Sequence, residues 1–157
     1  MTEQEQLSVF DMFKIGIGPS SSHTLGPWRA MQNFIQRLEF NQSLDLVSSI
    51  KVELFGSLAK TGRGHGTDIA LQLGLSGYDP VTFDVNSLHQ IIDEINQQQF
   101  LMLAGKMKIA FNPTSDIVFN FTQNLTYHPN ALTITAQMES GKIITETYYS
   151  VGGGFVV

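Results

Sequence analysis

The sequence predicts an α+β fold, a two-layer α/β sandwich with a mixed or antiparallel sheet. Apolar residues recur at helical spacing in the first two thirds of the chain, whereas apolar and polar residues alternate in the last third. The chain has 157 residues, of which 42% are hydrophobic and 15% charged, which is ordinary globular composition. Without an internal repeat or a low-complexity linker, we expect one domain over residues 1–157.

The first half is expected to hold helices around one strand. A short apolar segment at Leu7–Phe13 is typical of one or two helical turns. Helical spacing predicts a longer helix over about Thr24–Phe40, and strict alternation predicts a half-buried strand over Val47–Gly56. A further short helix is expected over about Asp68–Leu75, ended by Gly77.

The second half is expected to begin with a helix and end in strands. Ser87 to Gln90 resembles a capping box, and apolar residues from Leu88 to Ile95 form the buried face of the helix that it opens. An Asn112-Pro113 turn and a Ser140-Gly141 hairpin turn separate the strands. The expected strands are Met107–Phe111, Val118–Phe121, Leu132–Met138 and Ile143–Val151.

Charge and hydrophobicity together argue against two classes of partner, nucleic acids and membranes. Net charge is −5, from 9 basic and 14 acidic residues, and the basic residues form no cluster, so we expect no nucleic-acid binding. No apolar run approaches the roughly 18 residues of a membrane span, so we expect no membrane partner. The polar, acidic start is unlike a signal peptide, and we expect a cytoplasmic protein.

The sequence contains no cysteine. This excludes disulfides, thiolate nucleophiles and any zinc or iron–sulfur site built from cysteines of this chain. The histidines are the remaining side chains that titrate near neutral pH, and they are His23, His65, His89 and His128. We expect His89, in the first turn of its helix, and His128, before a proline, to be solvated.

Three serines, a histidine and a threonine precede the long N-terminal helix. They are Ser20, Ser21, Ser22, His23 and Thr24. A helix N-terminus presents unpaired N–H groups and the positive end of its dipole, and added hydroxyls would hold a carboxylate from several directions. The alternative is that one serine caps the helix and the others are ordinary loop residues.

A second candidate loop runs from Gly62 to Asp68. Gly64 and Gly66 flank His65 and would allow a ligand to approach its ring, which could act as a general base near neutral pH. The loop does not end in the Gly-Lys-Ser/Thr of a phosphate-binding loop. The alternative is an ordinary flexible loop with an exposed histidine.

The sequence closes on a glycine run, Gly152-Gly153-Gly154, followed by apolar residues. A glycine hinge that leads into apolar residues usually continues into more protein. We therefore expect this domain to be part of something longer, or one half of a two-chain enzyme.

The run from Ser8 to Pro27, which contains Lys14-Ile15-Gly16-Ile17-Gly18-Pro19 and the serine-rich loop, resembles the opening of bacterial iron–sulfur L-serine dehydratases. In order, three further motifs also resemble that family. They are Phe55-Gly56-Ser57-Leu58, Gly64-His65-Gly66-Thr67-Asp68 and Tyr148-Tyr149-Ser150-Val151-Gly152-Gly153-Gly154-Phe155. The resemblance spans essentially the whole chain and favours the functional interpretation of both loops.

The resemblance implies deamination of L-serine to pyruvate and ammonia. In the family, three cysteines of a second domain hold a [4Fe–4S] cluster whose open iron acts as a Lewis acid on the serine hydroxyl. The implied partners are L-serine and this iron–sulfur catalytic domain, in the same or a separate chain, within a homo-oligomer. Having no cysteine, this chain is expected to bind no cofactor itself and to be inactive alone.

The resemblance also implies roles for residues. Ser20, Ser21, Ser22, His23 and Thr24 would bind the substrate carboxylate. His65 would be the base, and Thr67 and Asp68 would orient it or the substrate ammonium; His23 remains the rival base.

Two other classes of function stay open in the sequence. The fold is also similar to a regulatory domain of some phosphoglycerate dehydrogenases, so a small-carboxylate sensor is the alternative. A sensor would keep its affinity for serine when isolated, whereas half of an active site would bind serine very weakly. The two polar loops argue against a purely structural dimerisation domain.

Overall fold

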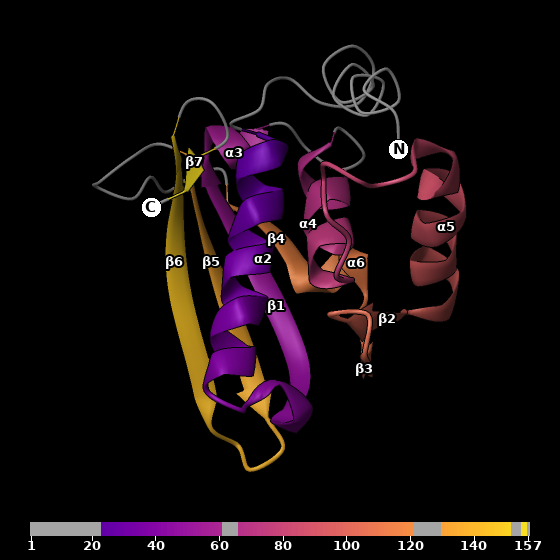
Figure 1. Ribbon diagram of the computed structural model, residues 1–157. Coiled ribbons are helices and arrows are strands. Elements are labelled where there is room, and N and C mark those ends of the chain that lie inside the picture. The colour runs from indigo at the N-terminus through magenta and orange to yellow at the C-terminus, as the bar shows by residue number, and fades with distance from the viewer. Residues whose placement is uncertain (1–22, 61–65, 121–129, 152–154, 157) are drawn as a thin grey trace.

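The computed structural model describes residues 23–60, 66–120, 130–151 and 155–156 (Figure 1). The short helix expected over Leu7–Phe13 lies outside these residues. The elements are α2 (Leu25–Phe40), a 3-10 turn (Leu44–Leu46), β1 (Val47–Gly56), α3 (Ser57–Lys60), α4 (Thr67–Leu75), a second 3-10 turn (Val85–Ser87), α5 (Leu88–Gln98), β2 (Phe100–Leu103), β3 (Met107–Ala110), α6 (Pro113–Asp116), β4 (Ile117–Asn120), β5 (Asn130–Met138), β6 (Ile143–Val151) and β7 (Phe155–Val156). Over the described residues, none of the helices combines the length and the apolar character needed to cross a membrane.

Among the described residues, the main sheet has five strands in the order β4-β1-β5-β6-β7. β1 runs parallel to β4 and antiparallel to β5, and the remaining pairs are antiparallel, so the sheet is mixed. β2 and β3 form a separate antiparallel hairpin. The expected α+β class with a mixed sheet is thereby confirmed.

Helices cover one face of the main sheet. Figure 1 shows α2 lying along β1 and β5, with α4 beside it. Ile50, Val52 and Leu54 of β1 are almost completely buried in the core, as their alternation predicts. The opposite face carries polar pairs between β5 and β6, with Thr133 Oγ1 and Thr147 Oγ1 3.0 Å apart.

α2 and α4 pack closely because α4 has a glycine at the contact. A Cβ on Gly74 would lie 2.8 Å from Met31 Cβ and 2.9 Å from the Trp28 carbonyl oxygen. Trp28 then joins a second apolar cluster with Phe83 and Leu88, which holds α5 on the side of α4 away from α2 (Figure 1). The molecule therefore has a main core at the sheet and a smaller one beneath α5.

The C-terminus of α4 is fixed to the β2–β3 hairpin. Gly77 has a φ of +89° and its N–H donates to the Gly74 carbonyl, while the Tyr78 N–H donates to the Leu73 carbonyl. This is the Schellman arrangement, for which glycine is the preferred residue. Gly77 ends the helix as predicted, and the Ala104 N–H of the hairpin turn donates to the Leu75 carbonyl at 2.7 Å.

Some local predictions are wrong. The Ser87 side chain makes no capping hydrogen bond to α5, because Asp84 caps the preceding 3-10 turn through Asn86 N–H and Ser87 already has helical φ and ψ. Strand β2 was not predicted from the sequence. The expected turn at Asn112-Pro113 is the start of α6, where Asn112 Oδ1 accepts from the Thr114 N–H at 3.0 Å.

Candidate functional site

The ends of several elements meet at one end of the sheet. β1 and β4 are parallel and finish there, β5 starts there and β6 finishes there. Figure 1 shows α2 and α4 beginning at this same end, at the top of the view. The first described residue of each predicted loop lies just before one of these helices: His23 is two residues before α2, and Gly66 directly precedes α4.

One hydrogen bond joins the borders of the two loops. Thr67 Oγ1 donates to the backbone carbonyl of His23 over 2.6 Å, and the Thr67 side chain is fully buried. A buried hydroxyl must be hydrogen-bonded to offset its desolvation, so this contact stabilises one arrangement of the two segments. Residues 44 positions apart in the chain are thereby brought together.

Burial changes the chemistry of His23. Its imidazole is half-buried, and desolvation of the charged form lowers its pKa from the usual value, which a hydrogen bond with the Ser57 backbone partly offsets. The neutral form therefore predominates at neutral pH. Sequence reasoning gave Ser57 no role, although it stands in the Phe55–Leu58 motif directly after β1.

Thr24 is the N-cap residue of α2. Its carbonyl accepts the first helical hydrogen bond, from the Trp28 N–H at 3.0 Å, and its side chain is buried without capping the helix. The N-cap position is thus held by a threonine, and Ser20, Ser21 and Ser22 lie outside the described residues. The first N–H groups of a helix have no partner within the helix itself, so this end of α2 offers donors to an anion.

Asp68 lies in the first turn of α4, where the helix dipole favours a negative charge. It begins a buried polar stripe along the helix. Gln72 Nε2 donates to the Asp68 carbonyl at 3.2 Å, and Ser76 Oγ donates to the Gln72 carbonyl at 2.7 Å. The stripe connects the N-terminal end of α4 to its C-terminal end.

The start of α2 is also held against the end of β6. A Cβ on Gly26 would overlap Ser150 Oγ, and Ser150 is only 2% exposed. This contact explains why the opening and closing motifs of the sequence both belong to this end of the molecule. Sequence reasoning attached no individual role to Gly26 or Ser150.

The structure thus brings four predicted residues together: His23 and Thr67 by a direct hydrogen bond, with Thr24 and Asp68 next to them in the chain. Ser20, Ser21, Ser22 and His65 lie outside the described residues, as does His128. Their roles stay predictions. His89 lies in the first turn of α5 and is exposed as expected.

This chain does not fit the iron–sulfur cluster that the family resemblance implies. Such clusters are held by cysteine thiolates, and the chain has no cysteine. Within the part that the structure describes, no three His, Asp or Glu side chains are grouped so that they could hold a metal ion.

The N-termini of two helices thus lie at one end of an α+β sandwich, and helix N-termini favour anionic groups. The sequence model described as "Serine dehydratase beta chain" matches residues 8–157, and the chain belongs to this family. It is 49% identical over 152 residues to an L-serine dehydratase of Streptomyces coelicolor, which covers 96% of this chain and 33% of the relative. L-serine dehydratase 1 of Escherichia coli is 42% identical over 152 residues, and the Haemophilus influenzae L-serine dehydratase 43% over 153 residues, again covering 96% of this chain and 33% of each relative. The chain spans about a third of the length of these curated relatives.

Proposed function

We propose that this chain is the substrate-handling domain of an L-serine dehydratase, a lyase that converts L-serine to pyruvate and ammonia. The observation that carries the proposal is the Thr67–His23 hydrogen bond, which joins the borders of the two family motifs at one end of the sheet. A catalytic domain outside this chain completes the enzyme, which we place in the cytoplasm as a homo-oligomer. The substrate then lies at the boundary between the domains, where small-molecule sites are common.

The substrate carboxylate is assigned to the start of α2. The N–H groups that follow Thr24 and the hydroxyls of Ser20, Ser21 and Ser22 supply donors there. Since burial favours the neutral imidazole of His23, this residue contributes a hydrogen bond rather than a positive charge. The helix end therefore provides most of the electrostatic stabilisation.

His65, the residue before Gly66, is assigned as the base that removes the proton from Cα of serine. Thr67 donates its hydroxyl proton to the His23 carbonyl, so it is a positioning residue that fixes the two loops relative to each other. Asp68, at the first turn of α4, orients His65 or the substrate ammonium. We place the ligands of the [4Fe–4S] cluster outside this chain, which has none of the thiolates that such a cluster requires.

The test compares three histidine variants of the complete enzyme that contains this chain. His65→Asn should lower kcat by about 10²–10⁴-fold, because a general base contributes that much. His23→Asn should chiefly raise KM for L-serine. His89→Asn replaces an exposed imidazole on α5 in the same way and should leave both constants unchanged. Pyruvate release and the visible absorbance of the enzyme are measured for each.

Near-normal turnover in His65→Asn, with altered turnover in His23→Asn, would move the base to His23. If all three variants behave like the parent, the site lies elsewhere and the proposal fails. Tight, saturable binding of L-serine by the isolated 157-residue chain would instead favour a serine sensor.

A further inference from the structure

A separate pocket lies at the opposite end of α4 from Thr67 and His23. It has a volume of about 290 Å³ and is bounded by α5, the β2–β3 hairpin and the segment after α4. Ser76 contributes to its wall, whereas Thr67 is the first residue of the same helix, so the two places are separated by the length of α4, roughly 13 Å. This volume is at the lower end of the range for small-molecule sites, which restricts the ligand to one of few atoms.

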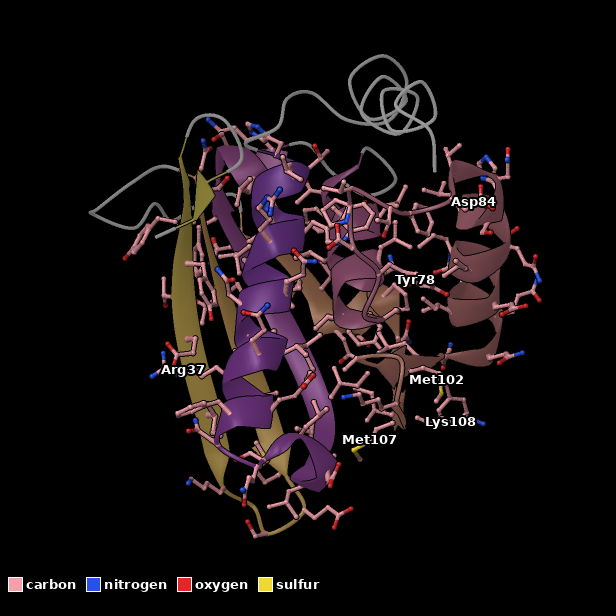
Figure 2. All side chains as sticks on the ribbon, in the orientation of Figure 1. Arg37, Tyr78, Asp84, Met102, Met107 and Lys108 are labelled. Atoms are coloured by element: carbon pink, nitrogen blue, oxygen red, sulfur yellow. The ribbon has the colours of Figure 1, made fainter. Side chains whose placement is uncertain are left out.

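The floor and rim of the pocket are apolar. Ile95 and Leu101 form a buried floor, and Phe100 and Met102 are 41% and 46% exposed at the rim. Tyr78 closes another side, where its ring meets Phe83 edge-on at 5.2 Å. Figure 2 shows Tyr78 between α4 and α5, with Met102 projecting from the hairpin below it. Large exposed apolar side chains gathered around a hollow are typical of a binding site.

Two opposite charges line this apolar pocket. Lys108 Nζ is held over the Phe100 ring, 4.4 Å from its centroid, and Glu94 enters from α5. Of the two ion pairs found among the described residues, neither involves Glu94 or Lys108. A carboxylate and an ammonium that share a pocket without pairing can each bind the opposite charge of one zwitterion.

We propose that this pocket binds an apolar α-amino acid. The ammonium of the ligand lies at Glu94, its carboxylate lies at Lys108, and its side chain covers Ile95 and Leu101. The inference does not depend on the proposed function, because none of these residues belongs to the site at the other end of α4.

Isothermal titration of the 157-residue chain at neutral pH tests the proposal with L-methionine, N-acetyl-L-methionine, which lacks the ammonium, and L-methioninamide, which lacks the carboxylate. L-methionine should bind about three- to tenfold more tightly than either derivative. Each derivative loses one charge contact, and a partly exposed charge contact changes the affinity by about this factor. L-serine, without an apolar side chain, should bind more weakly still.

Charge variants locate the two contacts. Glu94→Gln should weaken L-methionine and L-methioninamide but leave N-acetyl-L-methionine unchanged, while Lys108→Met should weaken L-methionine and N-acetyl-L-methionine but leave L-methioninamide unchanged. Lys106→Met is the matched control, because Lys106 lies on the same hairpin but pairs with Glu39 outside the pocket. Glu94 and Lys108 are both exposed, so their substitution should not disturb the fold, and circular dichroism verifies that the variants fold.

Three results would overturn the proposal. One is the absence of saturable binding of L-methionine up to about 10 mM, which is tenfold above a Kd of about 1 mM. Another is L-serine binding as tightly as L-methionine. The third is an equal loss of affinity in the Lys106→Met control and in the two pocket variants.

Discussion

At the residue scale, the surroundings of His23 determine how its imidazole responds to pH. Desolvation favours its neutral form, and the hydrogen bonds from Thr67 to its carbonyl and with the Ser57 backbone keep it in place. The family motif identified His23 as a candidate, but its protonation state depends on burial. Segments distant in the sequence bury His23, so its protonation state could not be predicted from the motif alone.

The depressed pKa of His23 gives the first prediction for stability. Because the unfolded chain has the ordinary imidazole pKa of about 6.5, it binds a proton at a higher pH than the folded chain does. The contribution of His23 to the free energy of unfolding is therefore complete above that value and is lost as pH falls below it. Urea unfolding at about pH 7.5 and pH 5.5 should show a larger loss for the parent than for His23→Asn.

His89→Asn is the control for this measurement, because it makes the same substitution at an exposed histidine on α5. Carboxylates that titrate in the same range affect the parent and both variants alike. If the parent and His23→Asn lose the same stability between the two pH values, His23 is not desolvated in solution as the structure has it.

At the element scale, the periodicity of apolar residues predicted the helices and strands whose positions depend on the local sequence. The apolar spacing of α2 and the alternation in β1 report which residues face the core, and both elements lie where they were expected. The parallel pairing of β1 with β4 joins residues such as Val52 and Ile117, which no local pattern links. The capping prediction at Ser87 failed because Asp84, three residues earlier, makes the competing turn.

Two glycines with similar backbone angles test how α4 is attached to the hairpin. Gly77 and Gly141 have φ of +89° and +92°, so alanine is strained at both and should cost about 1–2 kcal/mol at each. At Gly77 the added Cβ would also lie 2.6 Å from the carbonyl carbon of Ala104, whereas nothing lies within 4 Å at Gly141. Gly77→Ala should therefore destabilise the chain further, by about 1–3 kcal/mol more than Gly141→Ala.

Chemical denaturation of the two variants measures this difference directly. Gly105→Ala serves as a second control, since its Cβ would make only an ordinary contact, 3.5 Å from the Ser76 carbonyl oxygen. Equal destabilisation by all three substitutions would show that the hairpin turn moves away freely and does not anchor α4.

At the scale of the whole molecule, α4 connects two places with different chemistry. Its first turn carries Thr67 and Asp68, at the end where the borders of the two family motifs meet, and Ser76, beyond its last turn, lines the pocket between α5 and the β2–β3 hairpin. The buried stripe through Gln72 runs between them, hydrogen-bonded to the helix backbone. Because α4 is buried along nearly its whole length, both places are built on one closely packed element.

The last prediction is that the chain folds without metal, because its apolar core is large. Phe34, Val52 and Leu54 are fully buried in a continuous cluster that joins α2 to the sheet, and no cysteine is available to hold a structural metal. Thermal unfolding followed by circular dichroism should give the same Tm with and without a chelator. Phe34→Ala, which empties part of the core, should lower Tm by roughly 6–20 °C, from a loss of about 3–5 kcal/mol, and so verifies that the measurement reports the core. Unfolding on addition of chelator, with recovery on addition of iron or zinc, would show instead that a bound metal supports the fold.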